Sequence, residues 1–316
     1  STTATTRGWF TTLAYPFQLL GFETYQGPGP SSADVPAYKC MKRGAAMTRV
    51  VCVIQARLGS MRLPDKVLLP LKGRPAVSWT ISQVRAASII DDVIVAMPDS
   101  QDSDALTSWC ELHHVAYSRG SEKDVLGRVY QAAALLKADV VVRVTGDCPL
   151  VDPGMIDQLV HAVIDHDFEY ARCSGEVPDG LGAEAVTMRT LGMVNDCAVE
   201  PHDREHVTTY LKRNSKSIKV IDVPENLSHI RLTLDEPADY EQLQSVLQFL
   251  DSTPVRYEEI ANLVQSMPEL FLMNSHIPRD EGAVLSSGEK LWKRAQAVIP
   301  GGSMLFSKRS ELQVNS

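Results

Sequence analysis

The chain has 316 residues, of which 44% are apolar, enough for one large or two smaller domains with a substantial core. Acidic residues outnumber basic ones by 39 to 31, and the net charge is −8, which argues against a protein that coats nucleic acid with a broad basic surface. No uninterrupted apolar run reaches the roughly eighteen residues of a transmembrane helix, so the sequence predicts no membrane span.

The first 46 residues differ in character from the rest of the chain. They are Thr/Ser-rich at the start, include the turn-rich segment Gly27–Ser32, and show no sustained apolar period. The segment Trp9–Phe22 is as apolar as a signal-peptide core, but Pro16 interrupts it. We therefore predict a poorly ordered extension over 1–46, a folded domain over 47–272, and a linker with the start of a further domain over 273–316.

From Met47 onward, strand-like and helix-like segments alternate. This alternation is typical of an α/β fold with a mostly parallel central sheet flanked by helices. The predicted strands are 49–54, 92–97, 115–117 and 139–144, and the predicted helices are 76–87, 102–113 and 122–136.

A cationic loop follows the first predicted strand. Between Arg57 and Arg74 the chain carries five basic residues against the single acid Asp65, although the whole protein is acidic. Gly59 and Ser60 among these cations allow backbone N–H groups to point at a ligand. Because open α/β sheets bind ligands at the carboxyl ends of their strands, the loop predicts a polyphosphate site.

Two carboxylates follow later apolar segments. Asp147 comes after the predicted strand 139–144, and Asp235 comes after a further predicted strand, His229–Leu234. Mg²⁺ is commonly held by one or two carboxylates together with phosphate oxygens and water, so this pair suits a magnesium site. The alternative is structural, because Asp147 could simply form a turn and Asp235 could cap a helix over Pro237–Leu250.

These motifs resemble those of a known family. The run Gln55–Lys66 is similar to the opening motif of the cytidylyltransferases that make CMP-activated sugars, including CMP-Kdo synthetase. Over about 47–250 the chain resembles the branch known as the spore coat polysaccharide biosynthesis cytidylyltransferases, through the motifs Gly120–Leu126, Val142–Pro149, Asp179–Gly180, Arg204–Thr208 and Leu232–Pro237.

The resemblance implies a nucleotide-diphospho-sugar transferase (glycosyltransferase-A-like) fold and a Mg²⁺-dependent transfer from CTP to a sugar-like acceptor, with release of pyrophosphate. It implies catalytic roles for Arg57, Lys66, Asp147 and Asp235, the two aspartates being the metal ligands. The implied nucleotide contacts are Ala56, Arg57, Ser60, Arg62, Lys66, Gly120, Ser121, Asp124, Thr145 and Gly146. The chain departs from the sugar-acid synthetases at Gln55, where a Pro is common, and at Thr145, where a Gln or a similar residue is usual.

The acceptor side of the site is expected within 171–209, which is rich in glycine and proline. Glu184, Glu205 and His206 are the candidate substrate contacts, and His206 is a candidate general base. His202 and His206 are four residues apart and could share a helix face, but no third soft ligand is spaced nearby, so zinc is disfavoured.

Near the end of the chain, 287–302 resembles the start of glutamate-1-semialdehyde-type aminotransferases. This suggests the front part of a longer bifunctional protein.

The six cysteines include no C-x-x-C pair, which favours reduced thiols in the cytoplasm. The resemblance also implies a homodimer. Two other classes stay open: a glycosyltransferase of similar fold, although an Asp-x-Asp motif is absent at Asp147, and a non-catalytic nucleotide-binding module of a fused protein.

Overall fold

The strand β1 (Val50–Gln55) forms the middle of the fold. In this computed structural model, which describes residues 48–166, 168–250 and 253–279, β1 pairs in parallel with β4 (Asp92–Pro98) and β6 (Val140–Thr145). Cys52 and Ile54 pack into one hydrophobic core and Val51 and Val53 into another. The uninterrupted apolar run is therefore explained by burial on both faces of the sheet.

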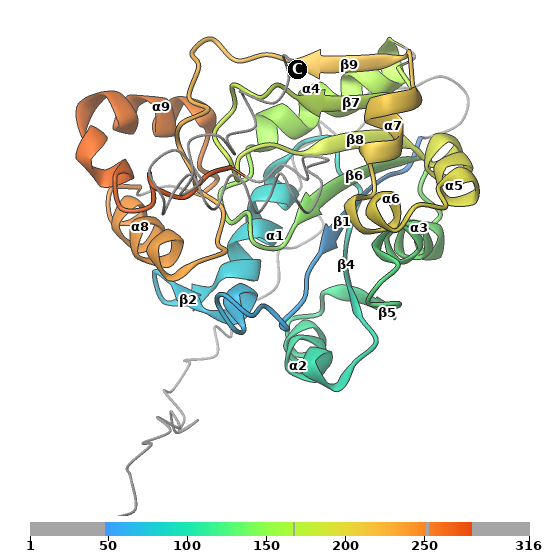
Figure 1. Ribbon diagram of the computed structural model, residues 1–316, viewed down its shortest axis with the longest axis horizontal. Coiled ribbons are helices and arrows are strands. Elements are labelled where there is room, and N and C mark those ends of the chain that lie inside the picture. Colours follow the sequence, from blue (N-terminus) through green and yellow to red (C-terminus); the bar gives the residue numbers. More distant parts are fainter. Residues whose placement is uncertain (1–47, 167, 251–252, 280–316) are drawn as a thin grey trace, which may run out of the picture. The chain divides into compact units, whose positions relative to one another are not determined.

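Within the described residues the main sheet has seven strands in the order β5-β4-β1-β6-β8-β7-β9 (Figure 1). The outer strands are β5 (Ala116–Gly120), β8 (Glu184–Thr187), β7 (Tyr170–Cys173) and β9 (Ile218–Ile221). The strand β8 pairs antiparallel with both of its neighbours, and the remaining pairs are parallel. The mostly parallel α/β sheet predicted from the sequence is confirmed.

Helices cover both faces of this sheet. One core includes residues of α1 (Ala76–Ala86), α2 (Asp104–Leu112) and α4 (Pro153–Asp165). The opposite core includes residues of α3 (Val125–Leu135), α5 (Met188–Cys197) and α7 (Thr209–Asn214). A third cluster is built largely from α8 (Pro237–Leu247), α9 (Tyr257–Ser266) and η4 (Pro268–Phe271). The shorter elements are η2 (Lys66–Leu68), β2 (Pro70–Leu71), β3 (Arg74–Pro75), η3 (Gln101–Ser103) and α6 (Pro201–His206).

Side-chain caps fix where the helices around the site begin. The Asp124 carboxylate accepts a hydrogen bond of 2.9 Å from the Gly127 N–H at the start of α3. At the start of α4, Asp152 accepts from the Met155 N–H at 2.6 Å. Such caps satisfy backbone donors that have no partner within the helix.

The prediction of a strand over His229–Leu234 is wrong. This segment forms one isolated bridge, between Asp179 and Arg231. The apolar alternation that suggested a strand has another cause: Ile230, Leu232 and Leu234 are buried in the core of α8 and α9. An extended segment with one buried side shows the period of a strand without a partner strand beside it.

The structural alternative for Asp235, a cap of the following helix, is not what the structure shows. Glu236, and not Asp235, is the N-cap of α8, where it forms a capping box with Asp239. The helix ends at Leu247 rather than at Leu250. Because Glu236 does the capping, the Asp235 carboxylate is available to the site.

The sequence prediction also missed β7, β8 and β9, each four residues long. Within the described residues, no helix is both long and apolar enough to cross a membrane. The five cysteines in this part of the chain are free thiols. The predicted extension over 1–46 and the aminotransferase-like segment 287–302 lie outside the described residues.

Candidate active site

The site lies where the direction of chain progression in the sheet reverses. From β1 the chain moves outward through β4 to β5, then returns to place β6 on the other side of β1. The carboxyl ends of strands at such a switch point form a crevice. Here the Gly146 N–H donates to the Gln55 carbonyl at 2.8 Å, and a Cβ at Gly146 would lie only 2.9 Å from the Ala56 Cβ. Glycine therefore allows the two loops to meet.

The most strongly charged contact in this crevice is an ion-pair cluster around Lys66. Its ammonium donates to the Asp147 carboxylate and, at 2.5 Å, to Asp235 Oδ1, and its side chain is only 8% exposed. Burial alone would lower the pKa of Lys66, but the two negative charges outweigh it and the pKa is raised. Lys66 in turn lowers the pKa of Asp147 against the effect of burial. Lys66 and Asp147 therefore both favour their charged forms.

Backbone pairing brings Asp235 to this cluster. The Leu234 N–H donates to the Asp147 carbonyl at 2.8 Å, and the Leu232 N–H donates to the Asp179 carbonyl at 2.7 Å. At the crossing point Gly180 has a φ of 95°, and a Cβ there would lie 2.5 Å from the Leu232 carbonyl carbon. A residue with a side chain would push the segment, and with it Asp235, away from Asp147.

Arg231 fixes the Asp235 side chain from behind. Its guanidinium lies 3.0 Å from Asp235, 2.8 Å from Asp179 and 2.9 Å from Asp239. Asp239 is fully buried and also accepts from the Asp235 N–H at 3.0 Å. Asn274 donates a further hydrogen bond to Asp239 at 2.8 Å. Both the backbone and the carboxylate of Asp235 are thus held by buried polar groups.

A smaller cavity of about 190 Å³ opens beside Lys66, and charged residues of both signs border it. Arg57 and Arg128 border it. Among the described residues Arg57 has no ion-pair partner, and Arg128 donates to the Ser121 carbonyl at 2.5 Å rather than to a carboxylate. Burial lowers the pKa of Arg128, and the like charge of Arg57 lowers it further. Four carboxylates, of Glu122, Asp147, Glu205 and Asp235, also border the cavity, but neither Arg57 nor Arg128 forms an ion pair within the described residues, so both guanidinium groups could bind an anion.

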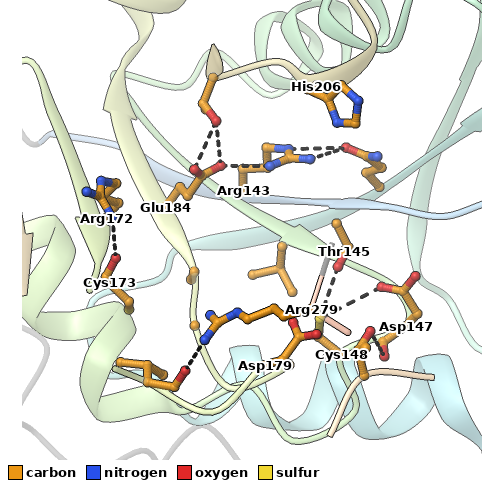
Figure 2. A pocket seen from close by; sticks show the side chains of 18 of the residues that line it. Arg143, Thr145, Asp147, Cys148, Arg172, Cys173, Asp179, Glu184, His206 and Arg279 are labelled. Carbon is orange, nitrogen blue, oxygen red and sulfur yellow. Dashed lines mark hydrogen bonds and ion pairs between the residues drawn. The ribbon is translucent and has the colours of Figure 1, made fainter. Parts of the chain in front are cut away.

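A larger cavity of about 370 Å³ lies on the other side of Asp147 and Asp235. Figure 2 shows Glu184 and Arg143 on one part of its wall and Asp147 and Asp179 on another. Gln55, Arg143, Thr145, Asp147, His206 and Asp235 border both cavities. Reacting groups held in the two cavities would meet at these shared residues.

Glu184 is the centre of a buried polar network in the larger cavity. Its carboxylate accepts hydrogen bonds from Arg143 at 2.7 Å, Tyr170 at 2.5 Å and Thr208 at 2.9 Å, and lies 3.1 Å from the Lys212 ammonium. Burial alone would raise its pKa, but Arg143 and Lys212 lower the pKa of Glu184 to about 2. Arg143 also donates two hydrogen bonds to the Gln55 side-chain oxygen, at 3.1 and 3.0 Å.

His206 is placed by an unusual turn. It ends α6, and the next residue, Val207, has a φ of 58° and a ψ of −56°. The Thr208 N–H donates to the His206 carbonyl at 2.5 Å, which closes a tight γ-turn that is rare for a residue with a side chain. The ring centroid of His206 lies 4.5 Å from that of His202. Within the described residues, no group of three or more His, Cys, Asp or Glu side chains has the geometry of a metal site.

The structure brings together many of the predicted site residues. Those that border the smaller cavity are Ala56, Arg57, Lys66, Thr145, Asp147, Glu205, His206 and Asp235, and those that border the larger one include Arg62 and Glu184. Ser60, Gly120, Ser121, Asp124 and Gly146 are not among the residues that line either cavity. The Asp124 carboxylate instead holds Arg204, at 2.8 and 2.5 Å, so its predicted contact with the nucleotide stays a prediction.

Sequence reasoning did not select Arg128, Arg143 or Arg231 as site residues. Arg143 carried a usable signal, because it is the one charged residue within the apolar strand Val140–Thr145, and a charge within a buried strand requires a partner. Arg231 stands at a polar position of the alternation at 230–234, where a charged side chain is ordinary, so it carried no such signal. The helical position of Arg128 carried no comparable signal.

The carboxylates suit a magnesium ion that is also bound by phosphate. The Lys66 ammonium forms ion pairs with both Asp147 and Asp235, so oxygens of the two carboxylates converge on one point from two sides. Two carboxylates that leave the other positions to phosphate oxygens and water form a donor set typical of Mg²⁺. They would not by themselves form a complete protein cage for the ion.

Comparisons with known proteins agree with this geometry. Residues 51–290 match the family model described as cytidylyltransferase. The chain is 34% identical to an uncharacterized protein of Methanocaldococcus jannaschii over 72% of this chain and 96% of that protein. It is 31% identical to the spore coat polysaccharide biosynthesis protein SpsF of Bacillus subtilis, over 71% and 97%.

The comparison with solved structures points to the same family. A cytidylyltransferase from Leptospira borgpetersenii superimposes with a TM-score of 0.68 at 26% identity, over 71% of this chain and 97% of that one. The family model covers well over half of the chain, and the two relatives are matched over nearly their whole length. On the strength of these matches and of the site geometry, the chain belongs to the cytidylyltransferase family.

Proposed function

We propose that this protein transfers the cytidylyl group of CTP to a hydroxyl of a sugar-like acceptor, with Mg²⁺, and releases pyrophosphate. The observation that carries the proposal is the cluster of Lys66, Asp147 and Asp235 at the border of two cavities. The smaller cavity presents the guanidinium groups of Arg57 and Arg128, which could bind a triphosphate, and the other cavity is larger and polar. A site of this kind catalyses mainly by positioning its ligands and neutralising their charge.

The triphosphate would bind in the smaller cavity. Arg57, Lys66 and Arg128 border this cavity, and guanidinium groups can bind phosphate oxygens in bidentate fashion. Ser60 and Arg62 belong to the same loop and are assigned to the phosphates by the family motif. The backbone around Ala56, Thr145 and Gly146 would pack against the nucleotide. Gly120, Ser121 and Asp124 keep their proposed role near the base and ribose.

Asp147 and Asp235 would hold Mg²⁺. When bound there, the ion offsets negative charge on the phosphate oxygens and on the departing pyrophosphate. Arg231 and Asp239 keep Asp235 in place for this purpose, through the buried hydrogen bonds described above. Lys66 contributes a further positive charge toward the phosphates.

The acceptor would bind in the larger cavity. Its hydroxyl oxygen attacks the α-phosphorus of CTP, the bond from that phosphorus to the pyrophosphate oxygen breaks, and the hydroxyl proton passes to a base. His206 is the proposed base because it borders both cavities. Glu205 would contact the ligands from the same helix, and Glu184 would support the acceptor side through Arg143.

The wider setting is also proposed. The name of the Bacillus subtilis relative refers to polysaccharide biosynthesis, which supports a role in surface polysaccharide or glycan assembly. We propose a cytoplasmic homodimer, in line with the expectation from the family. Sedimentation velocity at micromolar concentrations tests the dimer, and a single monomeric species would contradict it.

One assay tests the function. The protein is incubated with Mg²⁺, each nucleoside triphosphate in turn and a panel of sugars and sugar acids, while pyrophosphate is measured. Release with CTP and one acceptor class supports the proposal, and release only with another nucleotide corrects the base. Transfer from a ready-made nucleotide sugar with release of nucleotide would instead identify a glycosyltransferase. Absence of turnover in every mixture would favour a non-catalytic module.

A further inference from the structure

The Lys66 ammonium lies where a bound cation would be expected. It hydrogen bonds to both proposed metal ligands, Asp147 and Asp235, and Lys66 is only 7% exposed. A lysine whose only role was to bind phosphate would extend into the smaller cavity, which Lys66 borders. In the ligand-free protein its charge is instead used to neutralise the two carboxylates.

The charges make this arrangement exclusive. Lys66 forms ion pairs with both Asp147 and Asp235, whereas the charge of Arg231 is shared with Asp179 and Asp239. The Lys66 ammonium hydrogen bonds to both carboxylates at once, so a divalent cation bound by the same two carboxylates would lie against a like charge in a mostly buried site. Like charges at such short range repel strongly where water is scarce. The ammonium and a divalent cation therefore compete for the same pair of carboxylates.

The structure offers a second position for the ammonium. Lys66 borders the smaller cavity together with Arg57 and Arg128, and a lysine side chain can swing on its four-carbon stem. In the empty cavity this movement would give up two close ion pairs for a position beside two guanidinium groups. With a triphosphate present the same movement gains an anionic partner. The move is thus favourable only when the nucleotide arrives.

We propose that Lys66 has a second role in the reaction, as the resident counter-ion of the metal site, which it vacates when the metal ion and the nucleotide bind together. This inference rests on the proposed function, because it assumes that Asp147 and Asp235 hold the metal. Its consequence is an order of binding. The site takes up little divalent cation alone, and nucleotide raises the affinity for the metal and the metal raises that for nucleotide, by the same factor.

The test is Mn²⁺ binding without nucleotide, measured by the electron paramagnetic resonance signal of free Mn²⁺. Wild type is compared with Lys66→Gln, which keeps hydrogen-bond donors but removes the charge, and with Lys216→Gln as a control at an exposed lysine. Lys66→Gln should bind Mn²⁺ at least about tenfold more tightly than wild type, because a competing charge is gone. Lys216→Gln should match wild type, and Lys66→Gln combined with Asp147→Asn should lose the gain.

Mn²⁺ binding by folded Lys66→Gln that is equal to or weaker than that of wild type would overturn the inference. The proposed function is tested separately, by CTP-dependent pyrophosphate release from wild type, and would stand if that release is observed. If Lys66→Gln fails to fold, wild type alone decides. Mn²⁺ should then bind at least about tenfold more tightly in the presence of saturating CTP than in its absence, after correction for Mn²⁺ bound by CTP in solution. The same affinity with and without CTP refutes the exchange.

Discussion

The two cavities that meet at Asp147 and Asp235 hold their cations in different ways. In the smaller one, Arg57 has no ion-pair partner within the described residues, and the buried Arg128 donates to backbone carbonyls. In the larger one Glu184 pairs with Arg143 and Lys212, and Asp179 pairs with Arg231, while Arg172 and Arg279 donate to backbone carbonyls. The smaller cavity therefore presents guanidinium groups that could bind an anion, whereas ion pairs hold part of the wall of the larger one in place.

This difference separates ligand binding from stability. Burial and the nearby charge of the exposed Arg57 disfavour the Arg128 cation in the smaller cavity, and a bound triphosphate would offset this cost. Paired charges in the larger cavity stabilise the fold and at the same time orient the wall that faces the acceptor. Substitutions at the border of the cavities should therefore affect turnover most, and those in the paired network should affect unfolding most.

The largest effect is expected at the border. Asp147→Asn removes one negative charge from the Lys66 cluster while keeping its shape, so a metal–nucleotide complex would lose one of its two carboxylates. Turnover should fall by roughly 10²–10³-fold, as is common when a preorganised charge is removed from an active site. The turnover rate is measured as pyrophosphate release at saturating CTP and acceptor. Asp165→Asn, on an exposed helix end, serves as the control and should be unchanged.

A stability effect of comparable size is expected behind the border. Asp239 is fully buried and accepts from Arg231, from Asn274 and from the backbone N–H groups of Asp235 and Glu236. Asp239→Asn breaks a buried ion pair and should lower the free energy of unfolding by about 4 kcal/mol. Urea denaturation measures this loss.

If Arg231 and Asp239 position Asp235, the same Asp239→Asn variant should also bind the metal–nucleotide pair less tightly. Mn²⁺ affinity in the presence of CTP should fall about tenfold, the size typical for groups that orient metal ligands. A variant with reduced stability and unchanged Mn²⁺ affinity would show that this network supports the fold alone.

Local patterns in the sequence were enough to predict the centre of the fold and one wall of the site. A β-branched run buried on both faces identifies β1 without knowledge of its neighbours, and cations directly after it mark the loop. Asp147 was predicted at a strand end, and it follows β6 there. The order of the strands then brings these two chain segments side by side.

The other wall could not be derived in the same way. Asp235 was expected near Asp147, yet it arrives on an extended segment that packs against α8 and α9 and not on a strand. Arg143 and Glu184 are register partners on β6 and β8, and β8 has only four residues, too few for a clear pattern. Asp124 caps α3, and its other partner, Arg204, lies eighty residues away. Such pairings depend on tertiary contacts that a local pattern does not contain.

A smaller effect, dependent on pH, is expected in the larger cavity. The pKa of Glu184 is lowered from its ordinary 4.5 to about 2, so its ion pairs contribute stability that is complete above about pH 5 and is lost as the pH falls toward 2. Glu184→Gln should lower the free energy of unfolding by about 3 kcal/mol at pH 7. Near pH 2 the difference from wild type should vanish.

Denaturant unfolding across pH 7 to 2 measures this, with the exposed Glu241→Gln as a control that follows wild type. A difference between wild type and Glu184→Gln that stays constant down to pH 2 would mean that the charge of Glu184 contributes little. It would also weaken the contrast between the two cavities, because the larger one would no longer be held by its paired charges.

The smallest effect is expected at Tyr170, which is fully buried and donates to Glu184 at 2.5 Å. Tyr170→Phe keeps the ring and removes one hydrogen bond to a charged acceptor, so it should cost about 1.5 kcal/mol of unfolding free energy. In the Glu184→Gln background the cost should fall to about half, because the acceptor is then neutral and such hydrogen bonds are weaker. An equal loss in both backgrounds would mean that Tyr170 does not act through the charge of Glu184. The expected coupling would instead place the Tyr170 hydroxyl within the charged network of Glu184. That network holds Arg143 against Gln55 at the border of the two cavities.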